Sequence, residues 1–276
     1  MTSLRIGTRE VARYCDGQDM PAQLSPRPYL HPVTTLAGET CTEVAPSDHR
    51  HHYGVSNAVV EINGSMFWGG GSYVHPDGYQ LLDNHGRQVG GPVDATDHMI
   101  NQEVEFLACD GSHLLTEQRR ITADLLPARE AWALGWHSRM IADAGALTIG
   151  SPATRGRTGA GYGGLFWRVS GEQVPTTAEV DGGGEVLGST SPWLLLVQER
   201  PSGPVSLLLA QRAGAVLPWF VRTTGYVGAG PAVAWSSHRH VAAGQTLDLH
   251  LTGVLLDRRI DAAAARTLYT ELEDLS

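Results

Sequence analysis

Lysine is absent from this chain of 276 residues, and all 20 of its basic residues are arginine. The absence of lysine excludes a Schiff-base lysine, a phosphate-loop lysine and a lysine general base. Arginine stays protonated in proteins, so it can bind oxyanions but is unsuited to accepting a proton. Any acid–base chemistry in this protein must therefore use other side chains.

Runs of basic residues and long apolar runs are also scarce. The net charge is −9, and the adjacent basic pairs are Arg119-Arg120 and Arg258-Arg259, so we expect no nucleic-acid partner. No apolar run reaches the ~18 residues that a membrane helix needs, and the first residues lack the apolar region of a signal peptide. These absences predict a cytoplasmic protein with no membrane partner.

Cysteine is rare too. The three cysteines, Cys15, Cys41 and Cys109, are widely spaced and odd in number. This spacing favours neither a disulfide framework nor a CxxC metal site.

Helical patterns are few, whereas glycine (33 residues) and proline (15 residues) are frequent, which favours short strands joined by turns. Asn63-Gly64 is a two-residue hairpin signal. Asp261 can cap one helix near the end of the chain, in which Leu268 and Leu272 share a face. The expected strands lie within residues 3–14, 55–62, 66–68, 99–108, 114–124, 128–136, 137–142, 146–149, 165–168, 193–198, 205–210, 219–222, 232–235 and 246–256, whereas residues 75–86 and 171–191 are expected outside the sheets.

These elements predict an all-β protein, a large antiparallel β-sandwich with one short C-terminal helix. A parallel βαβ architecture is disfavoured because helical patterns do not alternate with the strands. Without a linker or an internal repeat, residues 1–276 are expected to form a single domain.

The densest chemistry lies in Asp48-His49-Arg50-His51-His52, where three of the chain's 12 histidines occupy four positions. On a strand, His49 and His51 would share one face, whereas on a loop all three imidazoles could converge. Histidine titrates near neutral pH, so a cluster beside Asp48 suits acid–base catalysis, with His49, His51 and His52 as catalytic residues. The alternative is that these histidines only hold a loop in place.

A divalent metal is a further possibility at the same cluster, because His-x-His can supply two ligands from one strand. Cupin-type sites add a glutamate a few residues on, whereas the next carboxylate here is Glu61, ten residues beyond His51. We therefore expect no cofactor, and keep a metal bound by His49 and His51 as an alternative.

Other residues could complete a substrate site. Arg27, Arg168 and Arg222 each lie in an apolar or aromatic setting, where a buried charge needs a partner. They could hold hydroxyl or carboxylate oxygens of a substrate, or form structural salt bridges. His31 and Asp48 join this candidate binding set.

Two further candidates have a structural alternative. Trp68 could stack on a sugar, although tryptophans between sheets are commonly core residues. Glu117 could be a catalytic base, or an exposed cross-strand partner of an arginine such as Arg119.

Three segments together resemble the soluble bacterial PmoA-like family: Arg27-Pro-Tyr-Leu-His31-Pro, Asp48-His-x-His-His-x-Gly54 and Asn63-Gly-x-x-Phe-Trp68. Gly163-Gly-Leu with Arg168, and Pro218-Trp-Phe-Val-Arg222 with Tyr226, extend the resemblance over nearly the whole chain. The family is similar to galactose-mutarotase-like β-supersandwiches, and its members tend to accompany sugar oxidoreductases. The resemblance thus implies that fold and carbohydrate chemistry, in which a histidine acid and a carboxylate base act on opposite sides of a sugar carbon.

Three hypotheses follow for a small-molecule carbohydrate partner. The first is an epimerase, lyase or hydrolase that uses histidine acid–base chemistry on a sugar, glycoside or keto-sugar. The second is a non-catalytic carbohydrate-binding β-sandwich. The third is a metal-dependent enzyme with a His-x-His site.

Overall fold

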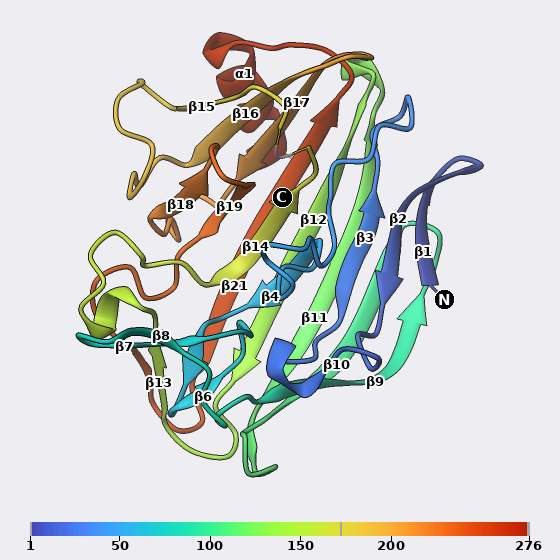
Figure 1. Cartoon of the computed structure of the whole chain (residues 1–276). Coiled ribbons are helices and arrows are strands. Elements are labelled where there is room, and N and C mark those ends of the chain that lie inside the picture. The colour runs from blue at the N-terminus through green and yellow to red at the C-terminus, as the bar shows by residue number, and fades with distance from the viewer. Residues whose placement is uncertain (1, 172, 275–276) are drawn as a thin grey trace.

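The computed structural model describes residues 2–171 and 173–274, and large antiparallel sheets dominate it (Figure 1). The first sheet has seven strands and contains the N-terminal segments that were expected to be extended. In spatial order its strands are β1 (Thr2–Ile6), β2 (Arg9–Cys15), β3 (Tyr29–Val33), β4 (Val55–Ala58), β14 (Gly164–Val169), β19 (Val227–Pro231) and β18 (Trp219–Arg222).

The second sheet has eight strands and includes the longest ones. In spatial order its strands are β15 (Thr176–Val180), β16 (Trp193–Arg200), β17 (Gly203–Ala210), β21 (Thr246–Leu256), β12 (Ala131–Ile141), β11 (His113–Leu126), β10 (Met99–Leu107) and β9 (Arg87–Ala95). The two sheets face one another (Figure 1), and alternate residues of each point into a shared apolar core. In that core Trp132 and Trp167 are fully buried.

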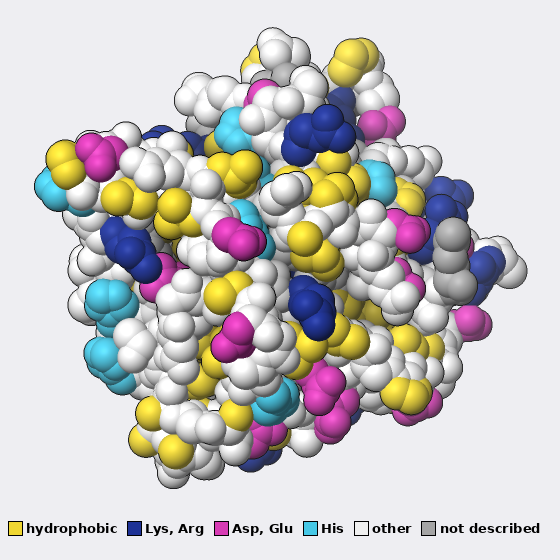
Figure 2. Space-filling model, turned by 60° about the horizontal axis from the view of Figure 1, so that its bottom comes forward, with side chains coloured by type: hydrophobic (Ala, Val, Ile, Leu, Met, Phe, Trp, Pro, Cys, Tyr) yellow, Lys and Arg dark blue, Asp and Glu magenta, His cyan; other side chains and the backbone are white. Residues whose placement is uncertain are grey.

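Smaller sheets close the end of the molecule that lies at the bottom of Figure 1. They are a four-stranded sheet of β20 (Arg239–Val241), β13 (Leu147–Gly150), β5 (Glu61–Ile62) and β6 (Ser65–Met66), and a pair of β7 (Ser72–Val74) and β8 (Gly78–Gln80). Figure 2 brings this end forward, and on the face it shows basic and acidic side chains are interspersed rather than gathered into one patch.

The α-helix α1 (Ala262–Asp274) covers part of the outer face of the eight-stranded sheet, the face turned away from the other sheet (Figure 1). The Asp261 carboxylate accepts a hydrogen bond from the Ala264 amide at 2.9 Å, as expected of an N-cap. Ala265 and Leu268 belong to one buried apolar cluster with Trp193 and Leu195 of β16, the strand that α1 contacts most. No helix of the described residues has the length and apolarity needed to cross a membrane.

The predicted fold class is confirmed: the chain is mostly β, with large antiparallel sheets and a C-terminal helix. The predicted pairing of residues 99–108 with 114–124 is the β10–β11 ladder, and Asn63-Gly64 forms the β5–β6 turn with φ values of 49° and 86°.

Several boundaries differ from the prediction. Residues 3–14 form two strands joined at a turn, and residues 128–142 contain one long strand, β12, where two short ones were expected. Residues 232–235 form no strand, whereas β8 lies within residues 75–86 and β15 within residues 171–191, the two segments expected outside the sheets. The edge strand β9 was missed because its Gly90-Gly91-Pro92 sequence is typical of a loop.

Candidate functional site

A pocket of about 310 Å³ opens beside the histidine cluster. It collects side chains from the loop before β4, the loops around β7 and β8, the loop before β14, and the segment from β18 to β19. Its lining residues are Asp48, His49, His51, His52, Trp68, Gly69, Gly71, Tyr79, Arg157, Tyr162, Phe220, Arg222 and Tyr226. Six of the ten predicted site residues therefore line one pocket.

The three imidazoles converge because their segment is a loop rather than a strand. The His49 amide donates to the Pro46 carbonyl at 3.1 Å, and the His52 amide donates to the His49 carbonyl at 2.9 Å. These successive turns bring the rings of His49 and His52 into a stack with centres 4.7 Å apart, and the ring of His51 meets His52 edge-on at 4.6 Å. The structure thus selects the convergent arrangement of the two that the sequence left open.

Asp48 and His49 form a hydrogen-bonded pair at the pocket wall. The His49 Nδ1 lies 2.5 Å from the Asp48 Oδ2, with both side chains partly exposed. The hydrogen bond from His49 holds the pKa of Asp48 below its usual range, so the carboxylate is ionised and accepts the Nδ1 proton. In the neutral tautomer that donates from Nδ1 to Asp48, the Nε2 of His49 is free to accept a proton, which is the arrangement that a histidine general base requires.

The other two imidazoles are held uncharged. Burial and the charge of Arg27 lower the pKa of His51 to about 4. Burial, together with His51 and His49, also lowers the pKa of His52, whose side chain is almost fully enclosed. Among the described residues the Nδ1 of His52 has no hydrogen-bond partner. Neutral imidazoles can donate or accept hydrogen bonds, and they place no positive charge beside the pair formed by Asp48 and His49.

Arg27 lies beneath the pocket and does not line it, although the sequence suggested substrate binding. The residue is 2% exposed, and its guanidinium donates to the carbonyls of His51 and Trp68 at 2.7 and 3.3 Å. Its remaining contacts are also within the protein, with the Leu24 and Ser25 carbonyls and the Ser56 hydroxyl. Buried donors must be satisfied, and these contacts of Arg27 hold the histidine loop in position.

Arg168 is likewise internal. Its side chain is fully buried and pairs with the Glu43 carboxylate at 2.9 Å. Its guanidinium also lies 5.0 Å from the centre of the Tyr226 ring, and Tyr226 in turn lies 4.6 Å from His49. Arg168 therefore supports the pocket wall from behind, and of the three predicted arginines Arg222 is the one that lines the pocket.

His31 and Glu117 lie away from the pocket. The His31 Nδ1 is 3.0 Å from the Thr42 hydroxyl, and burial followed by Arg13 lowers the pKa of His31. Glu117 is fully buried between the sheets and bound by Arg119 through two hydrogen bonds of 3.0 and 2.7 Å. Arg119 is the expected kind of partner, but the two residues lie on the same strand, β11, and are buried, so the contact is neither exposed nor cross-strand. A buried carboxylate needs such a charged partner.

The sequence did not predict Arg157 as a site residue, nor most of the aromatic wall of the pocket, which is formed by Trp68, Tyr162, Phe220 and Tyr226. Arg157 donates a hydrogen bond to the Tyr79 hydroxyl, which lies 2.9 Å from the Tyr162 hydroxyl. Tyr162 also packs on Trp68, with ring centres 4.6 Å apart. The glycine-rich loop at 158–164 was visible in the sequence, with Arg157 directly before it and Tyr162 within it. The loop lies far from the histidines in the sequence, so its place in the same pocket could not be predicted.

The pocket can accommodate a polar ring-shaped molecule. Trp68, Tyr162, Phe220 and Tyr226 supply apolar faces, Arg157 and Arg222 supply cations, and the histidines and Asp48 supply hydrogen-bonding and proton-accepting groups. Burial raises the pKa of Tyr226 to about 12, so its hydroxyl remains protonated at neutral pH.

A metal at His49 and His51 lacks a third ligand among the described residues. The ring centres of the two histidines are 6.0 Å apart, but they belong to no group of three ligand-type atoms within 4.8 Å of one another. In the described part of the chain, three ligand-type atoms gather within 4.8 Å of one another at His137, Asp248 and His250, on a different part of the fold.

Comparison with other proteins places the chain in a family. No curated protein sequence matches it. The model of a family of unknown function, DUF6807, matches residues 1–270. That match spans nearly the entire sequence, and the chain therefore belongs to the DUF6807 family.

Proposed function

We propose that the pocket binds a small carbohydrate and that His49, oriented by Asp48, transfers a proton on it. The observation that carries this proposal is the 2.5 Å contact between Asp48 and His49 inside a pocket that also holds two arginines and an aromatic wall. The resemblance to PmoA-like proteins, and through them to galactose-mutarotase-like supersandwiches, supports a sugar as the ligand class. The proposed reactions are those of an epimerase, a lyase or a hydrolase acting on a sugar, glycoside or keto-sugar.

The proposed role of each pocket residue follows from whether its side chain can accept, donate or stabilise a proton or a charge. His49 accepts a proton at Nε2 while Asp48 stabilises the resulting imidazolium, because a carboxylate on the opposite ring nitrogen fixes the tautomer. Arg222 binds the oxygen on which negative charge develops. His51 and His52, both held neutral, bind hydroxyl groups, and the Tyr226 hydroxyl donates from the same wall.

Proton exchange gives a direct test. The protein is incubated in deuterated water with a panel of sugars, uronates and keto-sugars, and deuterium incorporation at carbon is followed by NMR. We expect incorporation with at least one ligand, and a loss of about 10²–10⁴-fold in the exchange rate for His49→Ala, the range typical of a general base. Ligand binding, measured by calorimetry, should persist in this variant.

A matched control is His113→Ala. His113 also contacts a carboxylate, with its Nε2 2.9 Å from Asp143, but it lies outside the pocket. The His113→Ala variant should catalyse deuterium exchange into the ligand at the wild-type rate. Equal loss in both variants, or wild-type exchange in His49→Ala, overturns the proposed role.

Non-catalytic carbohydrate binding is the second candidate, and the aromatic wall favours it. In that case the wild-type protein binds a sugar without turnover or proton exchange. Trp68→Ala then weakens sugar binding, and His49→Ala shows the same absence of exchange as the wild type.

A further inference from the structure

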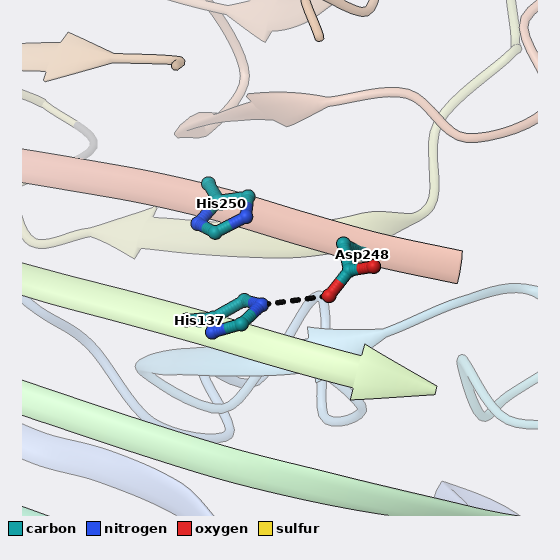
Figure 3. Close-up of side chains that lie close together, drawn as sticks. All are labelled: His137, Asp248 and His250. Carbon is teal, nitrogen blue, oxygen red and sulfur yellow. Dashed lines mark hydrogen bonds and ion pairs between the residues drawn. The ribbon is translucent and has the colours of Figure 1, made fainter. Parts of the chain in front are cut away.

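A second cluster of ligand-type side chains lies on the outer face of the eight-stranded sheet. His137 on β12 is directly opposite His250 on β21 in the antiparallel register. Asp248 precedes His250 by two residues, so both side chains point to the same face of β21. Figure 3 shows the three side chains gathered there, with His137 and Asp248 joined by a hydrogen bond. None of these residues lines the pocket described above.

We propose that His137, Asp248 and His250 form a binding site for a divalent transition-metal ion, with zinc as the best match. Two imidazoles and one carboxylate are ligands that zinc commonly takes in proteins. One ligand atom from each residue lies within 4.8 Å of the other two. Zinc bonds of about 2.0–2.1 Å place neighbouring donors roughly 3.4 Å apart in a tetrahedral site. Donors that now lie as far as 4.8 Å apart therefore need to approach by up to about 1.4 Å.

Side-chain rotation can supply that approach. The two imidazole rings are stacked 4.0 Å apart and nearly parallel, at 9°. The lone pair of an imidazole nitrogen lies in the ring plane, so one ring must turn for both to point at a single ion. His137 and Asp248 are 37% and 45% exposed and have room to turn, with their present contact at 2.9 Å.

His250 provides the fixed side of the site. It is half-buried at the place where the cover provided by α1 ends, beside a small cavity that is also lined by Thr252, Tyr269 and Glu273.

Two arginines on the same sheet affect which ions this cluster can bind. In the sheet register Arg120 is opposite His137, and Arg139 is opposite Asp248. These cations weaken the attraction for a metal ion. They also favour an anion or hydroxide at the coordination position that three protein ligands leave open. The site is therefore expected to hold one ion together with water or a small anion.

Zinc chloride titrated into the metal-free full chain, followed by calorimetry, tests this proposal. We expect one zinc ion per chain in the wild type. His250→Ala and His137→Ala should lose more affinity than the roughly 10- to 100-fold that follows removal of an outer-shell partner. Zinc should also raise the Tm of the wild type but not of these variants, because an ion that binds only the folded state stabilises it.

Two further variants distinguish this site from other histidines. His113→Ala removes a histidine whose Nε2 lies at the same 2.9 Å from a carboxylate but which has no second imidazole opposite it, and it should bind zinc as the wild type does. His51→Ala probes the pocket cluster and should also leave zinc binding unchanged. Loss of zinc in His51→Ala with retention in His250→Ala overturns the proposal, as does wild-type affinity in both His137→Ala and His250→Ala.

Folding of the variants is checked by their Tm without zinc, which should stay close to that of the wild type because the substituted side chains lie on the outer face. If His250→Ala is unstable, His137→Gln on the more exposed side provides the same test. Wild-type zinc affinity in that variant means that the His137–Asp248 contact only joins two strands, and the proposal fails.

Discussion

At the scale of the single residue, Glu117 and Arg119 form an ion pair whose two side chains are both fully buried. Despite burial, which opposes its charge, Glu117 raises the pKa of Arg119. Glu117→Gln keeps the size of the side chain and leaves the arginine without its counter-charge. We expect a loss of about 3–5 kcal/mol in the free energy of unfolding, measured by urea denaturation at neutral pH.

The control for this change is Glu199→Gln, in the exposed pair with Arg259, which should cost at most about 1 kcal/mol. A Glu117→Gln protein of wild-type stability that has lost turnover would contradict the structural role and return Glu117 to the catalytic candidates.

The pocket histidines make stability depend on pH. The pKa of His51 falls from its ordinary 6.5 to about 4 in the folded protein. Between these values the unfolded chain binds a proton that the folded chain does not, so the free energy of unfolding decreases as the pH falls from about 6.5 towards 4. His51→Gln should reduce the difference between the urea midpoints at pH 7 and pH 5. An unchanged difference, equal to that of His113→Gln, would show that His51 titrates normally.

At the scale of the element, α1 depends on its first turn. The Asp261 side chain accepts a hydrogen bond from the Ala264 amide, and the helix covers apolar residues of β16. Asp261→Ala should lower the free energy of unfolding by about 1 kcal/mol, since it leaves an N-terminal amide of the helix without its partner. Urea denaturation followed by circular dichroism measures this loss. Asp261→Asn retains an accepting oxygen, so a loss of similar size in that variant would argue against capping.

The histidine loop is the element on which the proposed chemistry depends. Arg27 fixes it from below through the His51 carbonyl, and Gly70 allows it to pack closely from the side. Gly70 has a φ of 73°, and a Cβ there would lie 2.9 Å from the His51 Nδ1. Both residues act on the pocket through His51, although neither lines it.

At the scale of the whole molecule, the two large sheets meet closely where β14 crosses β21. A Cβ on Gly253 would lie 2.3 Å from the Trp167 ring, which fills the space between the sheets. Gly253→Ala should therefore destabilise the protein by about 1–3 kcal/mol through overpacking, measured as a shift in the urea midpoint. Gly91→Ala, on the edge strand β9 where the nearest atom is 3.4 Å away, should shift the midpoint much less. Equal shifts of the urea midpoint in the two variants would contradict overpacking at Gly253.

Some features of this protein could be predicted from neighbouring residues alone. The β10–β11 pair, the Asn63-Gly64 turn and the Asp261 cap depend on contacts within one hairpin or one turn, and all three were predicted. The position of the histidine cluster was also visible, because its members are adjacent in the sequence.

Tertiary structure decided which charges face the pocket and which support it. Arg27, Arg168 and Arg222 look alike in the sequence, yet only Arg222 lines the pocket, whereas Arg27 contacts buried carbonyls and Arg168 pairs with Glu43. The physical reason is that burial and partnership arise from packing between segments far apart in the chain. The same packing brings Arg157 beside the histidines and places His137 opposite His250, arrangements that local sequence does not encode.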